Sequence, residues 1–216
     1  MAGRAWIRVS GLRVINARPD VNSNGILVTA SHDILVDNNR TENTRSSGIG
    51  VWGSRNVTVR ANEIVKACSG GYQEALTIAG TDTFVVEKNT IRDSADKEGI
   101  TLKDGSRNGT ARGNILYNVP RVAIYVDAWD KSTSNITVSG NVVHDSYSGI
   151  MLASEMGGLL ANIRIVNNVL FRNEFFGIAV TRNGDEGGPH PMTGIEIVNN
   201  TTWNNGDAWG GGIAVD

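Results

Sequence analysis

The sequence predicts an all-β solenoid of about eight coils, each with three short strands. Two observations lead to this prediction: a repeat along the chain, and the alternation of aliphatic residues within it. Each repeat opens on Gly or Ala, runs through aliphatic stretches separated by a polar break, and ends on Asn. These Asn residues recur every 23 to 32 positions, at Asn39, Asn62, Asn89, Asn114, Asn141, Asn168 and Asn200. Such a period indicates stacked units that bury their apolar faces only against their neighbours.

Residues 48–67 illustrate one coil. Alternating apolar residues predict strands at 49–52 and from 57 to 59, and a third short strand at 64–65. Leucine-rich repeats need leucines at fixed offsets, whereas these positions hold Ile and Val, and propeller blades need four strands in about 40–45 residues. No stretch has a 3.6-residue apolar period, so we expect few helices.

The first strands of the coils align across the whole chain. They begin at Gly25, Gly48, Ala75, Gly99, Ala123, Gly149, Gly177 and Gly212. The second and fourth residues of each are Ile, Leu or Val and are expected to point inward, so the third and fifth point to solvent. Because adjacent coils lie about 4.8 Å apart, the register predicts that Lys103 and Asp127 are stacked neighbours with Tyr125 beside them.

The repeated Asn residues are interpreted as structural. Stacked Asn side chains hydrogen-bond to one another and to the backbone of turns, and Asn tolerates a left-handed backbone. Several Asn residues begin N-x-T patterns, for example Asn56, Asn135 and Asn200. We interpret them as ladder or turn residues and not as glycosylation sites.

Composition narrows the function classes. The chain has 216 residues, 40% apolar, with a net charge of −2, so it lacks the basic field that nucleic acid or an anionic membrane would need. There is no transmembrane run and no signal peptide. Cys68 is the single cysteine, and we expect it to be a small, partly buried filler. We expect one domain over residues 1–216, a fragment without end caps that self-associates through its open ends.

The loops that follow the first strands are expected to lie beside the outward residues of the middle coils. The breaks after the first strand lengthen toward the C-terminus, at 128–134, 153–161 and 181–193. Loops on a rigid scaffold often carry function. They are expected to bring several polar residues to one rim: Trp129, Asp130, Glu155, Arg182, Asp185, Glu186 and His190.

Three stretches carry a family resemblance: EGITLKDGSRNGTARGN, VPRVAIYVDAWDKST and GIMLASEMGGLLANIRIVNN. With them the chain resembles the right-handed parallel β-helix repeat proteins of the pectate-lyase-like superfamily. The resemblance implies a right-handed parallel β-helix, a carbohydrate-active function, and a polysaccharide or oligosaccharide bound along the first-strand face. It also implies an extracellular or periplasmic location for the full-length protein. Many members of the superfamily have no known activity.

One spacing is similar to that of chondroitinase- and alginate-type lyases, in which a Glu precedes the first strand and a Lys base follows five residues later. Glu98 and Lys103 match it, and Glu74 resembles the acid of the preceding coil that helps to hold calcium in that group. A calcium site of Glu74, Glu98 and Asp104 is therefore one possibility. The group's Arg in the next coil is replaced here by Asp127, which weakens the lyase interpretation. The paired Asp residues that mark polygalacturonases are absent.

Glycoside hydrolysis needs two carboxyl groups, about 6.5–9.5 Å apart for inversion. Asp127 and Glu155 lie on adjacent coils, offset by two residues, and continued strand geometry would separate them by roughly 8 Å. We expect Lys103 to hold Asp127 ionised as the base and Glu155 to act as the acid. Asp130 is a second possible partner. The expected substrate-binding residues are Trp52, Tyr125, Trp129, Glu98 and Arg182.

Each of these residues also fits an ordinary structural role. Lys103 and Asp127 fit an ordinary ion pair on a solvent face, and Glu74 and Glu98 fit polar turns. The leading hypothesis is a glycan-cleaving hydrolase that needs no cofactor. The alternatives are a polysaccharide lyase with Lys103 as base, a carbohydrate-binding module without activity, and a purely structural segment.

Overall fold

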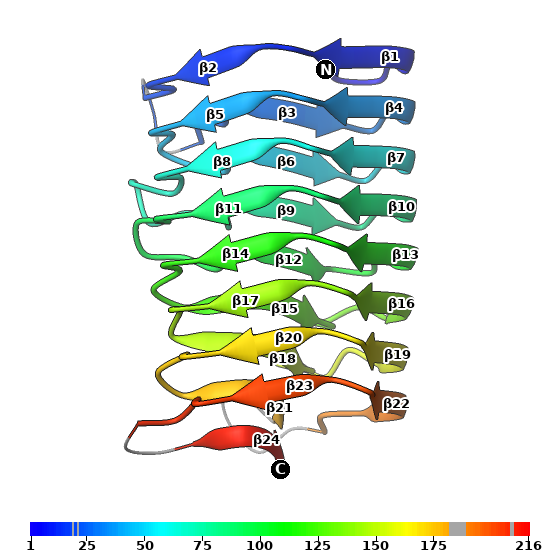
Figure 1. Ribbon diagram of the computed structural model, residues 1–216. Helices are drawn as coiled ribbons and strands as arrows, with labels where there is room; N and C mark the ends of the chain where they lie inside the picture. The colour runs from blue at the N-terminus through cyan, green and yellow to red at the C-terminus, as the bar shows by residue number, and fades with distance from the viewer. Residues whose placement is uncertain (19, 21, 182–188, 208–209) are drawn as a thin grey trace.

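The computed structural model describes residues 1–216 except 19, 21, 182–188 and 208–209. Its strands form three parallel sheets of eight strands each, and the chain visits the three sheets in turn (Figure 1). The described residues contain no helix, and so none that is long and apolar enough to cross a bilayer. The predicted solenoid of about eight three-stranded coils is confirmed.

The first sheet contains the predicted first strands: β3 (Ile26–Thr29), β6 (Ile49–Trp52), β9 (Leu76–Ala79), β12 (Ile100–Lys103), β15 (Val122–Asp127), β18 (Ser148–Ala153), β21 (Phe176–Thr181) and β24 (Gly211–Val215). The second sheet contains β1 (Ala5–Ser10), β4 (His32–Asp37), β7 (Arg55–Arg60), β10 (Asp82–Glu87), β13 (Arg107–Arg112), β16 (Thr133–Ser139), β19 (Leu160–Val166) and β22 (Met192–Val198). The third sheet contains β2 (Arg13–Ile15), β5 (Arg40–Glu42), β8 (Glu63–Val65), β11 (Thr90–Arg92), β14 (Ile115–Tyr117), β17 (Val142–His144), β20 (Val169–Phe171) and β23 (Thr201–Trp203).

The predicted register of the first sheet is also confirmed. The second residues of the eight aligned segments pair in one unbroken row, from Ile26 and Ile49 at one end to Ile178 and Ile213 at the other. Thr101 pairs with Thr77 on one side and Tyr125 on the other. The inward Ile, Val and Leu side chains fill a single continuous core. Parallel stacking therefore aligns equivalent positions of every coil, which is what lets a site be built across several coils.

Local fit explains why a glycine interrupts one strand of the second sheet. Phe84 in β10 is almost fully buried, and it pairs in register with Gly109 in β13. A Cβ atom on Gly109 would lie 2.0 Å from the Phe84 ring, closer than any non-bonded contact allows. The aromatic ring thus occupies the space that a side chain at position 109 would need.

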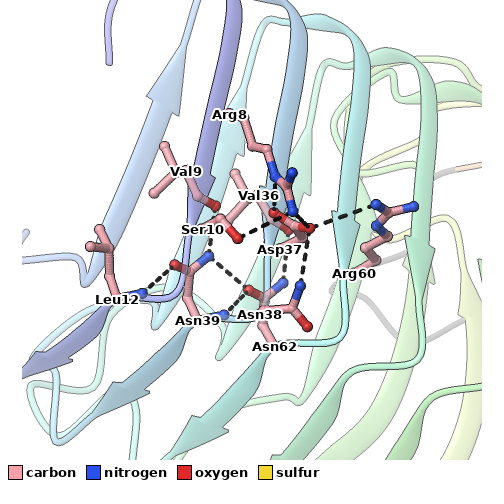
Figure 2. Close-up of polar contacts among 10 residues, drawn as sticks. All are labelled: Arg8, Val9, Ser10, Leu12, Val36, Asp37, Asn38, Asn39, Arg60 and Asn62. Atoms are coloured by element: carbon pink, nitrogen blue, oxygen red, sulfur yellow. Dashed lines mark hydrogen bonds and ion pairs between the residues drawn. The ribbon is translucent and has the colours of Figure 1, made fainter.

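The Asn repeat forms a buried ladder, as predicted. The Asn62 Oδ1 accepts hydrogen bonds from the backbone N–H of Asn39 at 2.9 Å and from its Nδ2 at 3.0 Å, and the Asn62 Nδ2 donates to the Val36 carbonyl at 3.0 Å (Figure 2). The same contacts recur from coil to coil as far as Asn200. Each Asn thereby satisfies backbone groups at a turn where the sheet ladder is interrupted.

A buried acid joins the first coils beside this ladder. Asp37 at the end of β4 has a side chain only 1% exposed, and Arg8 of β1 donates to it through two nitrogens, at 2.9 and 2.7 Å (Figure 2). Arg60 of β7 approaches the same carboxylate at 3.6 Å. The hydrogen bonds from Arg8 are the largest influence and lower the pKa of Asp37 to about 2. The ionised acid therefore ties three consecutive coils together.

Candidate functional site

A pocket of about 290 Å³ opens on the outer face of the first sheet. Its lining contains four carboxyl groups, those of Glu74, Glu98, Asp127 and Glu155, and three cationic side chains, Lys97, Lys103 and Arg121. Thr101, Val122, Tyr125 and Trp129 complete the lining. The residues come from β12, β15 and the segments that adjoin β9, β12, β15 and β18. Stacked strands and their adjoining loops therefore bring together charged residues that lie as much as 81 positions apart in the chain.

Most of the predicted site residues meet in this pocket. Lys103, Tyr125, Asp127, Trp129, Glu155 and Glu98 all line it, together with Glu74. Asp130, Trp52 and Asp104 do not line it. Arg182, Asp185 and Glu186 lie outside the described residues.

Lys103 is paired with Glu74 and not with Asp127. The Lys103 Nζ donates to the Glu74 Oε1 at 2.7 Å, and both side chains are largely buried. Burial alone would lower the pKa of Lys103, but the charge of Glu74 and the hydrogen bond to it outweigh burial and raise that pKa. The expected ion pair between Lys103 and Asp127 is therefore wrong. A lysine held as a cation is also poorly suited to act as a base.

Asp127 is a buried acid and not an exposed one. It is 3% exposed, and its Oδ1 accepts a hydrogen bond from the backbone N–H of Trp129 at 2.8 Å. Burial is the main influence and raises the pKa of Asp127 to about 7, although hydrogen bonds from the backbone of Trp129 and Glu155 oppose the rise; the negative charge of Glu155 adds to it. The expectation that Lys103 keeps Asp127 fully ionised is wrong, because desolvation outweighs the nearby charge.

Backbone hydrogen bonds join the two loops that follow β15 and β18. The backbone N–H groups of Met156 and Gly158 both donate to the Trp129 carbonyl, at 3.1 and 2.8 Å. The segment after β18 is thereby fastened to the segment after β15, above the end of the strand that carries Asp127. Tyr125 and Met151, which were predicted to face solvent, are each only 7% exposed, because they pack with Val122 in a second apolar cluster.

Glu155 lies in a turn, because β18 ends at Ala153. The separation of roughly 8 Å expected from continued strand geometry therefore has no basis here. The hydroxyl of Tyr125 donates to the Glu155 Oε1, so Tyr125 orients an acid and does not present a free ring. The backbone N–H of Glu155 also contacts the Asp127 carboxyl. The two carboxyl groups of the hydrolase hypothesis thus line one pocket and interact electrostatically.

The two expected aromatic platforms differ. Trp129 is 44% exposed at the pocket, which leaves its indole available to a ligand. Trp52 folds back over its own strand, because a Cβ atom on Gly50 would lie 2.0 Å from the Trp52 ring. Gly50 provides the space in which the indole lies flat, away from the pocket.

The three acids of the possible calcium site, Glu74, Glu98 and Asp104, do not line one pocket in the structure. Glu74 and Glu98 share the pocket, but Asp104 is not part of its lining. Nowhere in the described part of the chain do three or more His, Cys, Asp or Glu side chains form a group suited to a metal ion. Three of the pocket acids have partners within the protein instead: Glu74 binds Lys103, Glu155 binds Tyr125 and Asp127 accepts from the backbone of Trp129.

Sequence reasoning missed Thr101, Lys97 and Arg121. Thr101 is 1% exposed and lines the pocket. A sequence pattern could have identified Thr101, because the chain repeats Glu-x-x-Thr at Glu74–Thr77 and at Glu98–Thr101. Lys97 and Arg121 precede their strands in polar segments that show no distinctive pattern.

Residues 1–159 match the protein family described as "Right handed beta helix region". The chain therefore belongs to this family of right-handed β-helix proteins, as its parallel sheets and stacked coils indicate. No curated protein shows a significant match to the chain.

Several solved structures share the fold at low sequence identity. The catalytic domain of a GH87 alpha-1,3-glucanase in complex with tetrasaccharides is 16% identical with a TM-score of 0.61, and the match covers 96% of this chain and 48% of that one. A hyperthermoactive exopolygalacturonase from Thermotoga maritima is 14% identical with a TM-score of 0.65, over 91% of this chain and 53% of that one. A tailspike protein mutant of Escherichia coli bacteriophage HK620, in complex with a pentasaccharide, is 10% identical with a TM-score of 0.51, over 81% and 38%. The chain spans about half the length of the first two structures.

Proposed function

We propose that this protein hydrolyses glycosidic bonds of a polysaccharide bound in the pocket of the first sheet. The observation that carries the proposal is the buried carboxyl of Asp127, with a pKa raised to about 7, beside a second carboxyl on Glu155. A glycosidase needs one carboxyl that retains its proton near neutral pH and another that is available as a carboxylate. The resemblance of the fold to a glucanase and an exopolygalacturonase supports the same class of reaction.

In this proposal Asp127 is the general acid and Glu155 is the second carboxylate, the reverse of the roles expected from the sequence. Asp127 donates its proton to the glycosidic oxygen as the bond to the anomeric carbon breaks. Glu155, held by the Tyr125 hydroxyl, assists water to add to the anomeric carbon, either directly as a base or after attacking that carbon itself. The products are two shorter sugar chains, with one water consumed. The choice between the two routes depends on the distance between the carboxyl groups in the bound complex.

Trp129 supplies a surface for the sugar. Its indole is exposed at the pocket, and the flat face of an aromatic ring packs well against the C–H groups of a pyranose ring. The solved structures of the glucanase and the tailspike protein contain oligosaccharides, which supports a saccharide as the ligand here. Because polysaccharides of this kind are met outside the cytoplasm, we place the full-length protein in the extracellular or periplasmic space.

The lyase alternative has less support. It needs a neutral Lys103 as base, whereas Glu74 raises the pKa of Lys103. It also needs cationic groups beside the uronate carboxylate; the pocket offers Lys97 and Arg121, but it also holds the acids Asp127 and Glu155. A binding module without activity remains the second candidate, and it is favoured by the same exposed Trp129.

The test is the release of reducing sugar from neutral and acidic polysaccharides by the wild type, Asp127→Asn and Glu155→Gln. Removal of a general acid or its partner is expected to lower the rate about 10²–10⁴-fold. Glu196→Gln is the matched control, since Glu196 lies exposed in β22 on the second sheet and should leave the rate unchanged. Full activity in both pocket variants would refute the assigned roles. Products with an unsaturated uronate end would identify a lyase, and glycan binding without release would identify a binding module.

A further inference from the structure

The Glu-x-x-Thr repeat places two equivalent pairs side by side on the first sheet. Thr77 of β9 and Thr101 of β12 are paired in register, and each follows a Glu by three residues. In the first pair, the Thr77 hydroxyl donates to the Glu74 Oε2 at 2.8 Å and also lies 3.0 Å from the Ser47 hydroxyl. This pair is closed, because every polar group in it has a partner within the protein.

The second pair is open. Thr101 is 1% exposed, yet its Oγ1 has no hydrogen-bond partner among the described residues. Glu98 lines the same pocket but makes no hydrogen bond to Thr101, and burial raises the pKa of the Glu98 carboxyl. Buried hydroxyls are rarely left without a partner, and each such case calls for an explanation.

The neighbouring coils explain why no described residue hydrogen-bonds to the Thr101 hydroxyl. Thr77 is reached by the residue before its own strand, Glu74, and by Ser47, the corresponding residue of the preceding coil. For Thr101, the corresponding residue of the preceding coil is Glu74, which Lys103 and Thr77 already engage. The corresponding residue of the next coil is Val122, which has no polar group to offer.

We propose that Thr101 and Glu98 form a hydroxyl-binding subsite on the floor of the pocket, and that its ligand is an uncharged sugar residue. A sugar hydroxyl accepts the hydrogen bond from the Thr101 Oγ1 and donates its own proton to the Glu98 carboxylate, so one ligand group closes the pair. An anionic sugar is disfavoured at this position by Glu98 and Glu155, neither of which forms an ion pair within the described residues. The chemical class of the ligand rests on the proposed function.

The test compares Thr101→Val with Thr77→Val in binding and in thermal stability. Binding is measured by calorimetry with neutral gluco-oligosaccharides and with galacturonate oligosaccharides, in an Asp127→Asn background in which turnover is expected to be slow. Thr101→Val is expected to weaken binding of the neutral oligosaccharides roughly three- to tenfold, the effect of one hydrogen bond, and Thr101→Ser should restore it. Thr101→Val should leave Tm unchanged or raise it, whereas Thr77→Val should lower Tm by about 2–4 °C or more, since it leaves Glu74 short of a donor.

The outcomes separate the subsite from the proposed function. Unchanged binding in Thr101→Val overturns the subsite, as does a loss of Tm equal to that of Thr77→Val, because the hydroxyl would then have a structural role. Preference for the galacturonate oligosaccharides overturns the uncharged ligand. If the wild type binds neutral oligosaccharides through Thr101 but releases no sugar, the hydrolase proposal fails and the subsite stands. If no oligosaccharide binds, both fail.

Discussion

Substitution of Asp127 by Asn should make the protein more stable above neutral pH. The pKa of Asp127 is about 7 in the folded protein and about 3.9 in an unfolded chain. Between these values the folded state holds a proton that the unfolded state has released, so the free energy of unfolding falls as pH rises. At about 1.4 kcal/mol per unit of pKa, the loss reaches about 4 kcal/mol at pH 8. Asn removes this loss, and its side-chain oxygen still accepts the hydrogen bond from Trp129.

Urea unfolding of the wild type and Asp127→Asn at pH 5, 6, 7 and 8 measures this effect. The two proteins should differ most at pH 8, with the variant the more stable, and the gap should shrink steadily toward pH 5. Glu196→Gln serves as the control, because that carboxylate is exposed and should leave the pH dependence as in the wild type. A gap that does not change with pH would refute the reasoning, since burial of an ionisable carboxyl could not then be its cause. The same result would remove the main support for Asp127 as a general acid.

Three further predictions follow from the same contacts. In a carboxyl NMR titration, Glu155→Gln should lower the pKa of Asp127 but leave it well above 3.9, because burial contributes more than the charge of Glu155; a fall to the ordinary value would contradict this order. Asn114→Ala removes four side-chain hydrogen bonds of the ladder and should cost about 4 kcal/mol in urea unfolding, whereas a cost under about 1 kcal/mol would mean that the ladder is not structural. Ionised Asp37 stabilises the fold above pH 4 and should lose that contribution, up to about 2 kcal/mol, as pH falls from 4 toward 2; in Asp37→Asn this acid-dependent loss should disappear.

The fold could be predicted from the sequence because its signals are local and repeated. Alternation of aliphatic residues places side chains inside or outside a strand, and the repeat forces every coil into one register. That register correctly brought Lys103, Tyr125 and Asp127 together on one face. The Asn ladder could be predicted equally well, since an Asn at the same turn of each coil stacks on its counterparts above and below.

The partners within the site could not be predicted in this way. Alternation determines the face on which Lys103 lies, but Lys103 pairs with Glu74 and not with Asp127. Trp52 was expected at the site but lies over Gly50, because only a glycine leaves room for the ring. Each of these contacts depends on which side-chain conformers fit among several coils at once. The sequence of a single repeat does not predict them.

The sequence by itself determined the solenoid, the register and the strip of the first sheet where polar residues gather. Only the tertiary structure decided that this strip is a pocket, that Asp127 is buried, and that the Thr101 hydroxyl has no partner in the described protein. The physical reason is that strand periodicity is a property of neighbouring residues, whereas desolvation depends on how loops from different coils pack over one another. The pKa of Asp127 therefore depends on its burial and on its contacts with Trp129 and Glu155, none of which the alternation of residues in the repeat predicts.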